Sequence, residues 1–261
     1  MNRSTIKVLL LIVFTVFIAI YFYFKEFGFY EDDYYHITVN LSSTLNDVIS
    51  MIWVRITNWI YGRPLIFVQD VLTYAGMKLG GLQALYLISY FILTLNSFLM
   101  YLILKRVYPE SDAFVVSGAM MYCLFPVNTT KILLAFSFSL QIALTFLIIS
   151  SLLYLSGRKT ISYFTIVGAL FLYDSAFIVF FGVPLLKLKW NKEFRKEFLK
   201  HVLVLFVILG VIFTVRFFMS EEKVLYILKD PFRFLGEAGK KNFGGLYFSG
   251  VLFLRNPVLA F

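Results

Sequence analysis

Three consecutive carboxylates, Glu31, Asp32 and Asp33, stand in the stretch "FGFYEDDYYHI", just beyond an unbroken apolar run. Carboxylates in such a place can bind a divalent cation or act as a general base on a hydroxyl, and partial desolvation raises their pKa toward the working range. Thirty residues after Asp33, "YGRPL" supplies Arg63, whose planar guanidinium can pair with a phosphate. Acid and arginine together suggest phosphate-linked chemistry at a membrane surface. On spacing alone, a solvated acidic loop and an arginine at a helix end explain the same residues.

The amino-acid composition predicts that membrane-spanning elements hold these residues in place. Of the 261 residues, 60% are hydrophobic and 15% are charged, against roughly 25% charged residues in an ordinary soluble domain. Open sheets cannot span lipid and the apolar runs lack the alternation of barrel strands, so we predict an all-α, polytopic transmembrane bundle. The chain reads as a single transmembrane domain, 1–261, with an outer loop at 25–63. The predicted spans are 6–24, 82–104, 113–127, 131–155, 161–186 and 201–219.

Loop charges predict the orientation of the bundle. Arg3 and Lys7 precede the first span, which is too long for a cleaved signal peptide and is interpreted as a retained anchor with a cytoplasmic N-terminus. The loop 25–63 then lies outside and carries three basic against five acidic residues. Basic residues in the short inner loops account for the formal charge of +9, so no nucleic-acid partner is needed. We predict an integral protein of the cell (plasma) membrane.

The apolar run 161–186 leaves two arrangements open. Asp174 stands in its middle, in "ALFLYDSAFIVF", where an unpaired charge is expensive at mid-bilayer. A single span would also put the most basic loop, 187–200, outside. The alternatives are a short hairpin that turns near Tyr173 to Ser175, which keeps both basic loops inside, and one helix whose Asp174 faces the bundle interior.

Residues 44–60 differ from the spans because their apolar side chains recur at helical spacing. Asn46, Asp47, Ser50 and Asn58 fall largely on the opposite side. This pattern predicts an amphipathic interfacial helix on the outer leaflet, with Trp53 and Trp59 at headgroup depth. His201, which opens the last predicted span, is expected at the membrane interface.

The order of these features resembles a known family. A first span, "EDD" followed by "YYH", an amphipathic helix, "GRPL" and a run of spans are similar to the GT-C superfamily of polytopic membrane glycosyltransferases. The later stretches "LFPVNTTK" and "LYDSAFIVFFGVPLL" also fit the pattern of bacterial members. The resemblance covers most of the chain but depends on short motifs.

The resemblance implies a transferase that moves a sugar from a polyprenyl-phosphate carrier to a lipid-linked or cell-surface glycan acceptor, as in polysaccharide biosynthesis of the cell envelope. It maps the catalytic carboxylate onto Asp32 or Asp33, with Asp33 alternatively a metal ligand or orienting partner, and both are the expected ligands of a Mg or Mn ion. Membrane lipids are the remaining expected partners. The expected substrate-binding residues are Glu31, His36, Arg63, Lys131 and Asp174.

Two departures from the family keep other functions open. Many members carry a further acidic residue in the second outer loop, where this chain offers only Asn128 and Lys131. Members usually have more spans, and the apolar end at Phe261 predicts a partial protein. The rival interpretation is a transporter or flippase without transferase activity, in which Asp70, Asp174 and the outer acids line a path. A third is an inactive relative that serves as a partner in a larger assembly.

Overall fold

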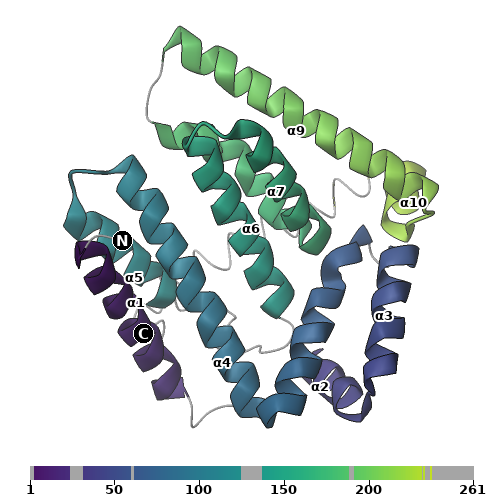
Figure 1. Cartoon of the computed structure of the whole chain (residues 1–261). Coiled ribbons are helices and arrows are strands. Elements are labelled where there is room, and N and C mark those ends of the chain that lie inside the picture. The colour runs from purple at the N-terminus through teal and green to yellow at the C-terminus, as the bar shows by residue number, and fades with distance from the viewer. Residues whose placement is uncertain are drawn as a thin grey trace.

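The computed structural model describes residues 3–23, 32–59, 62–124, 137–187 and 191–230, together with 232 and 236, and within these residues all regular structure is helical (Figure 1). The predicted all-α class is therefore confirmed for the described part of the chain. Three helices are long and apolar enough to cross a membrane, over Pro64–Val107, Phe138–Leu155 and Lys192–Phe218. Three further apolar helices are shorter, over Ile6–Ile18, Asp112–Cys123 and Lys159–Leu172.

The longest helix, α4 (Phe67–Val107), consists of two arms. Gly80 and Gly81 break the helical backbone between them, with Gly81 at φ 62° and ψ −140°, a conformation that favours glycine. Figure 1 shows the arms meeting at this kink. Gly76 of the first arm lies so close to the Leu85 side chain of the second that a Cβ there would clash. The predicted span 82–104 corresponds to the second arm, and the two arms diverge from the kink as a V (Figure 1).

Two helices, one before and one after α4 in the chain, pack against its second arm. α1 (Arg3–Tyr23) and α5 (Asp112–Leu124) pack with it around the fully buried Ile12, Val16 and Ala119. A hydrogen bond of 2.9 Å from the Tyr90 hydroxyl to the Val13 carbonyl fixes α1 against α4. These helices correspond to the predicted spans 6–24 and 113–127 as far as the described residues extend.

The run 161–186 is divided in two. α7 (Lys159–Leu172) ends at Tyr173, whose extended backbone (φ −153°, ψ 112°) separates it from α8 (Asp174–Val179) and the 3-10 helix η4 (Phe180–Lys187). Lys159, at the start of α7, and Lys187, at the end of η4, both contact Glu197, at 2.8 and 2.6 Å. The chain therefore leaves one end of the bundle, turns at Tyr173 and returns to the same end.

We call the end of the bundle that holds Lys159 and Lys187 the basic end. The last long helix, α9 (Lys192–Phe218), runs from the basic end to α10 (Glu222–Lys229), which lies next to α3 in Figure 1. Asn191 caps its start, because the side-chain oxygen accepts a hydrogen bond from the Phe194 amide at 2.8 Å. His201 is 1% exposed within the protein, because α6 (Ser137–Leu155), α7 and η4 enclose it, and its expected depth at the membrane interface stays a prediction. Its Nε2–H donates to the Phe180 carbonyl, so Nδ1 accepts from the Tyr163 hydroxyl.

The predicted helix 44–60 corresponds to α3 (Leu45–Asn58), which follows the short α2 (Asp32–Ser42). A capping box starts α3: Thr44 and Asp47 exchange hydrogen bonds, and these bonds lower the pKa of Asp47. Leu45, Ile49 and Trp53 are 61%, 55% and 68% exposed, so an apolar stripe of α3 faces away from the protein. The amphipathic helix is therefore present, and its location on the membrane surface stays a prediction.

Candidate functional site

The helix that begins with Asp32 and Asp33 packs along the first arm of α4. His36 of α2 faces Asp70 of α4, with 3.6 Å between Nδ1 and Oδ1, and further along both helices the Leu41 carbonyl accepts a hydrogen bond from Lys78. Because these two contacts ascend along both helices, α2 and the first arm run in the same direction. The backbone of Asp32 and Asp33 therefore lies toward the end of the arm where Arg63 precedes η2 (Pro64–Ile66).

Asp70 joins three helices at this point. Its side chain is 4% exposed and lies 3.4 Å from Nε of Arg55 on α3, in addition to its contact with His36. The distance to Arg55 is that of an ion pair without a directed hydrogen bond. A buried carboxylate requires such partners, so Asp70 fixes α2 and α3 relative to α4.

A second group of charges surrounds Arg216 near the end of α9. Its Nη2 donates to the Asp174 carboxylate at 2.9 Å and to the Gly62 carbonyl at 2.7 Å, and its Nε lies 3.7 Å from Glu221. The side chains of Arg216 and Glu221 are 13% and 4% exposed. We call Gly62, Arg63, Asp174, Arg216 and Glu221 the arginine cluster.

Gly62 allows these groups to approach the backbone. Its φ of +67° lies in the left-handed region, and a Cβ at this position would lie 2.6 Å from Nε of Arg216 and 2.7 Å from Oε2 of Glu221. Glycine is therefore required here for two reasons, the backbone conformation and the close packing of a charged pair.

Arg63 is the remaining cation of the arginine cluster. Its guanidinium lies over the ring of Tyr173, 4.6 Å from the centroid, a cation–π arrangement that holds it in place. Its Nε is buried and has no hydrogen-bond partner among the described residues, and none of the carboxylates described in the structure pairs with it. The structure thus brings together Arg63 and Asp174, two residues predicted from separate motifs, and among the described residues no carboxylate neutralises Arg63.

The arginine cluster lies at the far end of α7 from the basic loops. α7 has 14 residues, so it spans about 21 Å at 1.5 Å per residue, whereas the hydrocarbon core of a bilayer is about 30 Å thick. If Lys159 marks one boundary, the turn at Tyr173 lies in the opposite half of the membrane and short of its surface. Ionisable groups at such a depth are expensive and usually functional.

Several predicted site residues are not tested. Glu31 and Lys131 lie outside the described residues, and only the backbones of Asp32 and Asp33 are described. Among the described residues, no group of three or more His, Cys, Asp or Glu side chains could hold a metal ion. The divalent cation therefore stays a prediction.

Sequence reasoning missed Arg216 and Glu221 and assigned Asp70 only to the rival transporter. An arginine within a predicted span, "IFTVRFF", is a signal that could have identified Arg216, because such residues are rarely placed in lipid without a function. Comparison with known proteins adds no assignment: no family model matches the chain, and no curated protein or solved structure matches it either.

Proposed function

We propose that this protein is a membrane glycosyltransferase that moves a sugar from a polyprenyl-phosphate carrier to a lipid-linked or cell-surface acceptor on the non-cytoplasmic face. The observation that carries the proposal is the guanidinium of Arg63, which is held over Tyr173 beside the Arg216 ion pairs and pairs with no carboxylate in the described part of the chain. Arg216 is matched by Asp174 and Glu221, so within the arginine cluster Arg63 has charge to offer a phosphate.

The chemistry requires a base and a cation at one place. Attack of an acceptor hydroxyl on the anomeric carbon transfers the hydroxyl proton to a base, here Asp32 or Asp33, and the bond to the carrier phosphate breaks. Arg63 then stabilises the negative charge that develops on the leaving phosphate. The common direction of α2 and the first arm of α4 supports this assignment, because it orients the start of α2 toward Arg63.

The predicted roles of the other groups follow from the same arrangement. His36 contacts Asp70 and so holds α2, rather than acting alone on a sugar. A Mg or Mn ion held by Asp32 and Asp33 would add positive charge near the phosphate. We assign α3 to the outer membrane surface, where its exposed apolar stripe would contact lipid.

Transfer of labelled sugar from a panel of polyprenyl-phosphate donors tests the proposal, in membranes that contain the intact gene product. We expect Arg63→Gln to lower transfer by about 100-fold, as loss of one electrostatic donor to a transition state typically does. Asp32→Asn or Asp33→Asn should abolish transfer, whichever carboxylate is the base.

Arg195→Gln is the matched control, because it removes the same charge from an exposed position on α9, far along the chain from the arginine cluster. It should leave transfer unchanged at equal protein level. Wild-type transfer that survives all three site variants would reject the assigned site.

A transporter or flippase is the second candidate, and one observation favours it. The ion pairs of Arg216 lie at a broken helix within the estimated membrane depth, which is also where transporters place substrate sites. Absence of transfer with every donor, together with uptake or flipping of a labelled lipid-linked sugar in vesicles that Asp174→Asn abolishes, would favour this function.

A further inference from the structure

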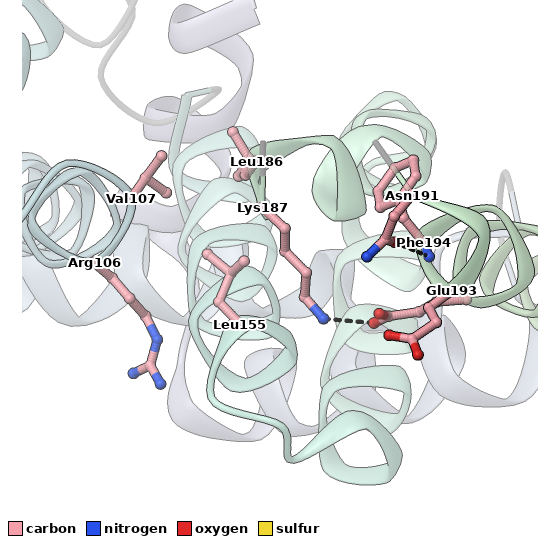
Figure 2. Close-up of a pocket in the computed structure, with 9 residues that line it drawn as sticks. Arg106, Val107, Leu155, Leu186, Lys187, Asn191, Glu193 and Phe194 are labelled. Atoms are coloured by element: carbon pink, nitrogen blue, oxygen red, sulfur yellow. Dashed lines mark hydrogen bonds and ion pairs between the residues drawn. The ribbon is translucent and has the colours of Figure 1, made fainter. Parts of the chain in front are cut away.

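We infer that the cavity at the basic end of the bundle binds the headgroup of an anionic phospholipid. This basic-end cavity has a volume of about 410 Å³ and lies between the ends of α4, α6 and η4 and the start of α9 (Figure 2). It lies at the opposite end of α7 from the arginine cluster, so it is a different site, and the inference does not depend on the proposed function.

The wall of the basic-end cavity combines the two kinds of residue that a phospholipid meets at the membrane interface. Val107, Leu155, Leu186 and Phe194 are apolar, and they can contact the glycerol and the upper part of an acyl chain. Arg106 and Lys187 are the basic residues that can bind a phosphate.

The wall carries two basic residues, Arg106 and Lys187, and two acidic ones, Glu193 and Glu197, and Lys159 beside the wall adds a third cation. Lys187 and Lys159 approach the same Oε1 of Glu197, at 2.6 and 2.8 Å, so two ammonium groups share one carboxylate. Arg106 is exposed and has no ion pair within the described part of the chain. Figure 2 shows Arg106 and Glu193 on opposite sides of Lys187. The planar fork of Arg106 is therefore free to bind two phosphate oxygens.

The surroundings add to the attraction for an anion. The described ends of α4, α5, α6, α7, η4 and α9 at this side carry nine basic and four acidic residues, a surplus of five positive charges. By the positive-inside rule this side faces the cytoplasm, and the cytoplasmic leaflet is the one that carries anionic lipids, which basic pockets between spanning helices bind.

Native mass spectrometry of the purified full chain tests the inference, with titration of phosphatidylglycerol against phosphatidylcholine in detergent. We expect one phosphatidylglycerol to bind in preference to phosphatidylcholine. Arg106→Gln should weaken this binding about tenfold, because one charge-assisted pair is lost, and Arg106→Lys should weaken it less. Arg195→Gln removes the same charge at an exposed position on α9 outside the cavity wall, so it should weaken binding much less than Arg106→Gln does.

Three results would overturn the inference. Equal binding of the two lipids would show that no anionic headgroup is recognised. Equal losses in Arg106→Gln and Arg195→Gln would assign the effect to overall surface charge. Complete displacement of the lipid by millimolar glycerol phosphate would show that the cavity takes a soluble phosphate ester instead. The melting temperature of each variant in the same detergent serves to confirm that the exposed Arg106 change leaves the fold intact.

Discussion

A single hydrogen atom in place of a side chain at Gly62 determines how closely the arginine cluster can pack. The carbonyl of this residue accepts from Arg216, and its α-carbon faces both Arg216 and Glu221. The charged groups therefore pack against the backbone of Gly62. A side chain at this position would displace Arg216 and Glu221.

We predict that Gly62→Ala destabilises the protein more than Gly157→Ala does. Both residues have positive φ, +67° and +83°, so both variants incur the left-handed strain of about 1–2 kcal/mol. Gly157 faces open space, whereas a Cβ at residue 62 meets Arg216 and Glu221, which adds about 1–3 kcal/mol of overpacking. Unfolding in mixed micelles measures the difference, and equal losses would contradict the packing described here.

Removal of the guanidinium at Arg216 should also be costly. We expect Arg216→Gln to lower the free energy of unfolding by about 3 kcal/mol, because Glu221 and Asp174 lose the cation that compensates their charge. A double variant, Arg216→Gln with Glu221→Gln, should recover part of this loss in the same denaturation assay. If the second change instead adds to the first, the two side chains are not coupled.

Residue-level reasoning from the sequence identified one half of the candidate site. Arg63 stood out because its guanidinium can pair with a phosphate and Asp174 because it interrupts an apolar run, and the fold brings them near one another. The partner of Asp174 could not be predicted, because Arg216 lies 42 positions further along the chain and a single sequence carries no signal for that pairing.

Two apolar segments of the chain reverse direction within the fold. α4 reverses at Gly80 and Gly81, and the run 161–186 reverses at Tyr173. The predicted span 82–104 begins directly after the first turn, and the second turn lies inside a run that hydropathy reads as continuous. Hydropathy therefore predicts the apolar helices but not that the chain folds back between them, and only the charge of Asp174 within an apolar run indicated one of the two turns.

The kink in α4 can be tested with a pair of glycines. We predict that Gly81→Ala lowers stability by about 1 kcal/mol, because its φ of +62° strains any L-residue. Gly210→Ala, in the middle of α9 and also in open space, should be neutral or stabilising, since alanine favours a regular helix. Equal effects in thermal unfolding would mean that the α4 kink does not need the positive φ.

The start of α3 should depend on pH through Asp47. The hydrogen bonds from Thr44 lower its pKa below the ordinary value of 3.8. The contribution of this cap is therefore present above the pKa of the unfolded chain, and it is lost as pH falls through the lower folded pKa. An NMR titration of the Asp47 carboxyl should detect this, and Thr44→Ala should return the pKa toward 3.8.

Thr57→Ala is the control for this titration, because Thr57 lies in the same helix and its hydroxyl donates to the Trp53 carbonyl rather than to Asp47. An Asp47 pKa that is the same in wild type and Thr44→Ala would show that the capping box does not lower this pKa.

For the molecule as a whole, the described charges separate into two ends. The basic-end cavity and Glu197 lie at one end of α7, and the arginine cluster lies at the other. By the positive-inside rule, the basic end is expected to face the cytoplasm. The proposed donor chemistry and the inferred lipid-headgroup binding are therefore assigned to opposite faces of the membrane.

Cysteine labelling should verify this orientation with little engineering. The chain has one cysteine, and Cys123 is 0% exposed, so an impermeant maleimide should not label the native protein. We expect Ser42→Cys, at an exposed site, to be labelled in intact cells and the exposed Ser156→Cys only after permeabilisation. Labelling of Ser156→Cys in intact cells would invert the predicted topology.

The hydrogen bond from Arg216 to the carbonyl of Gly62 joins residues 154 positions apart. At ribosomal rates of about 5–20 residues per second, Gly62 leaves the synthesis machinery roughly ten to thirty seconds before its partner exists. Throughout that interval the nascent chain already holds α2, α3 and the first arm of α4 but lacks the helix that completes the arginine cluster. The arginine cluster is therefore completed only late in synthesis, after the end of α9 has been made.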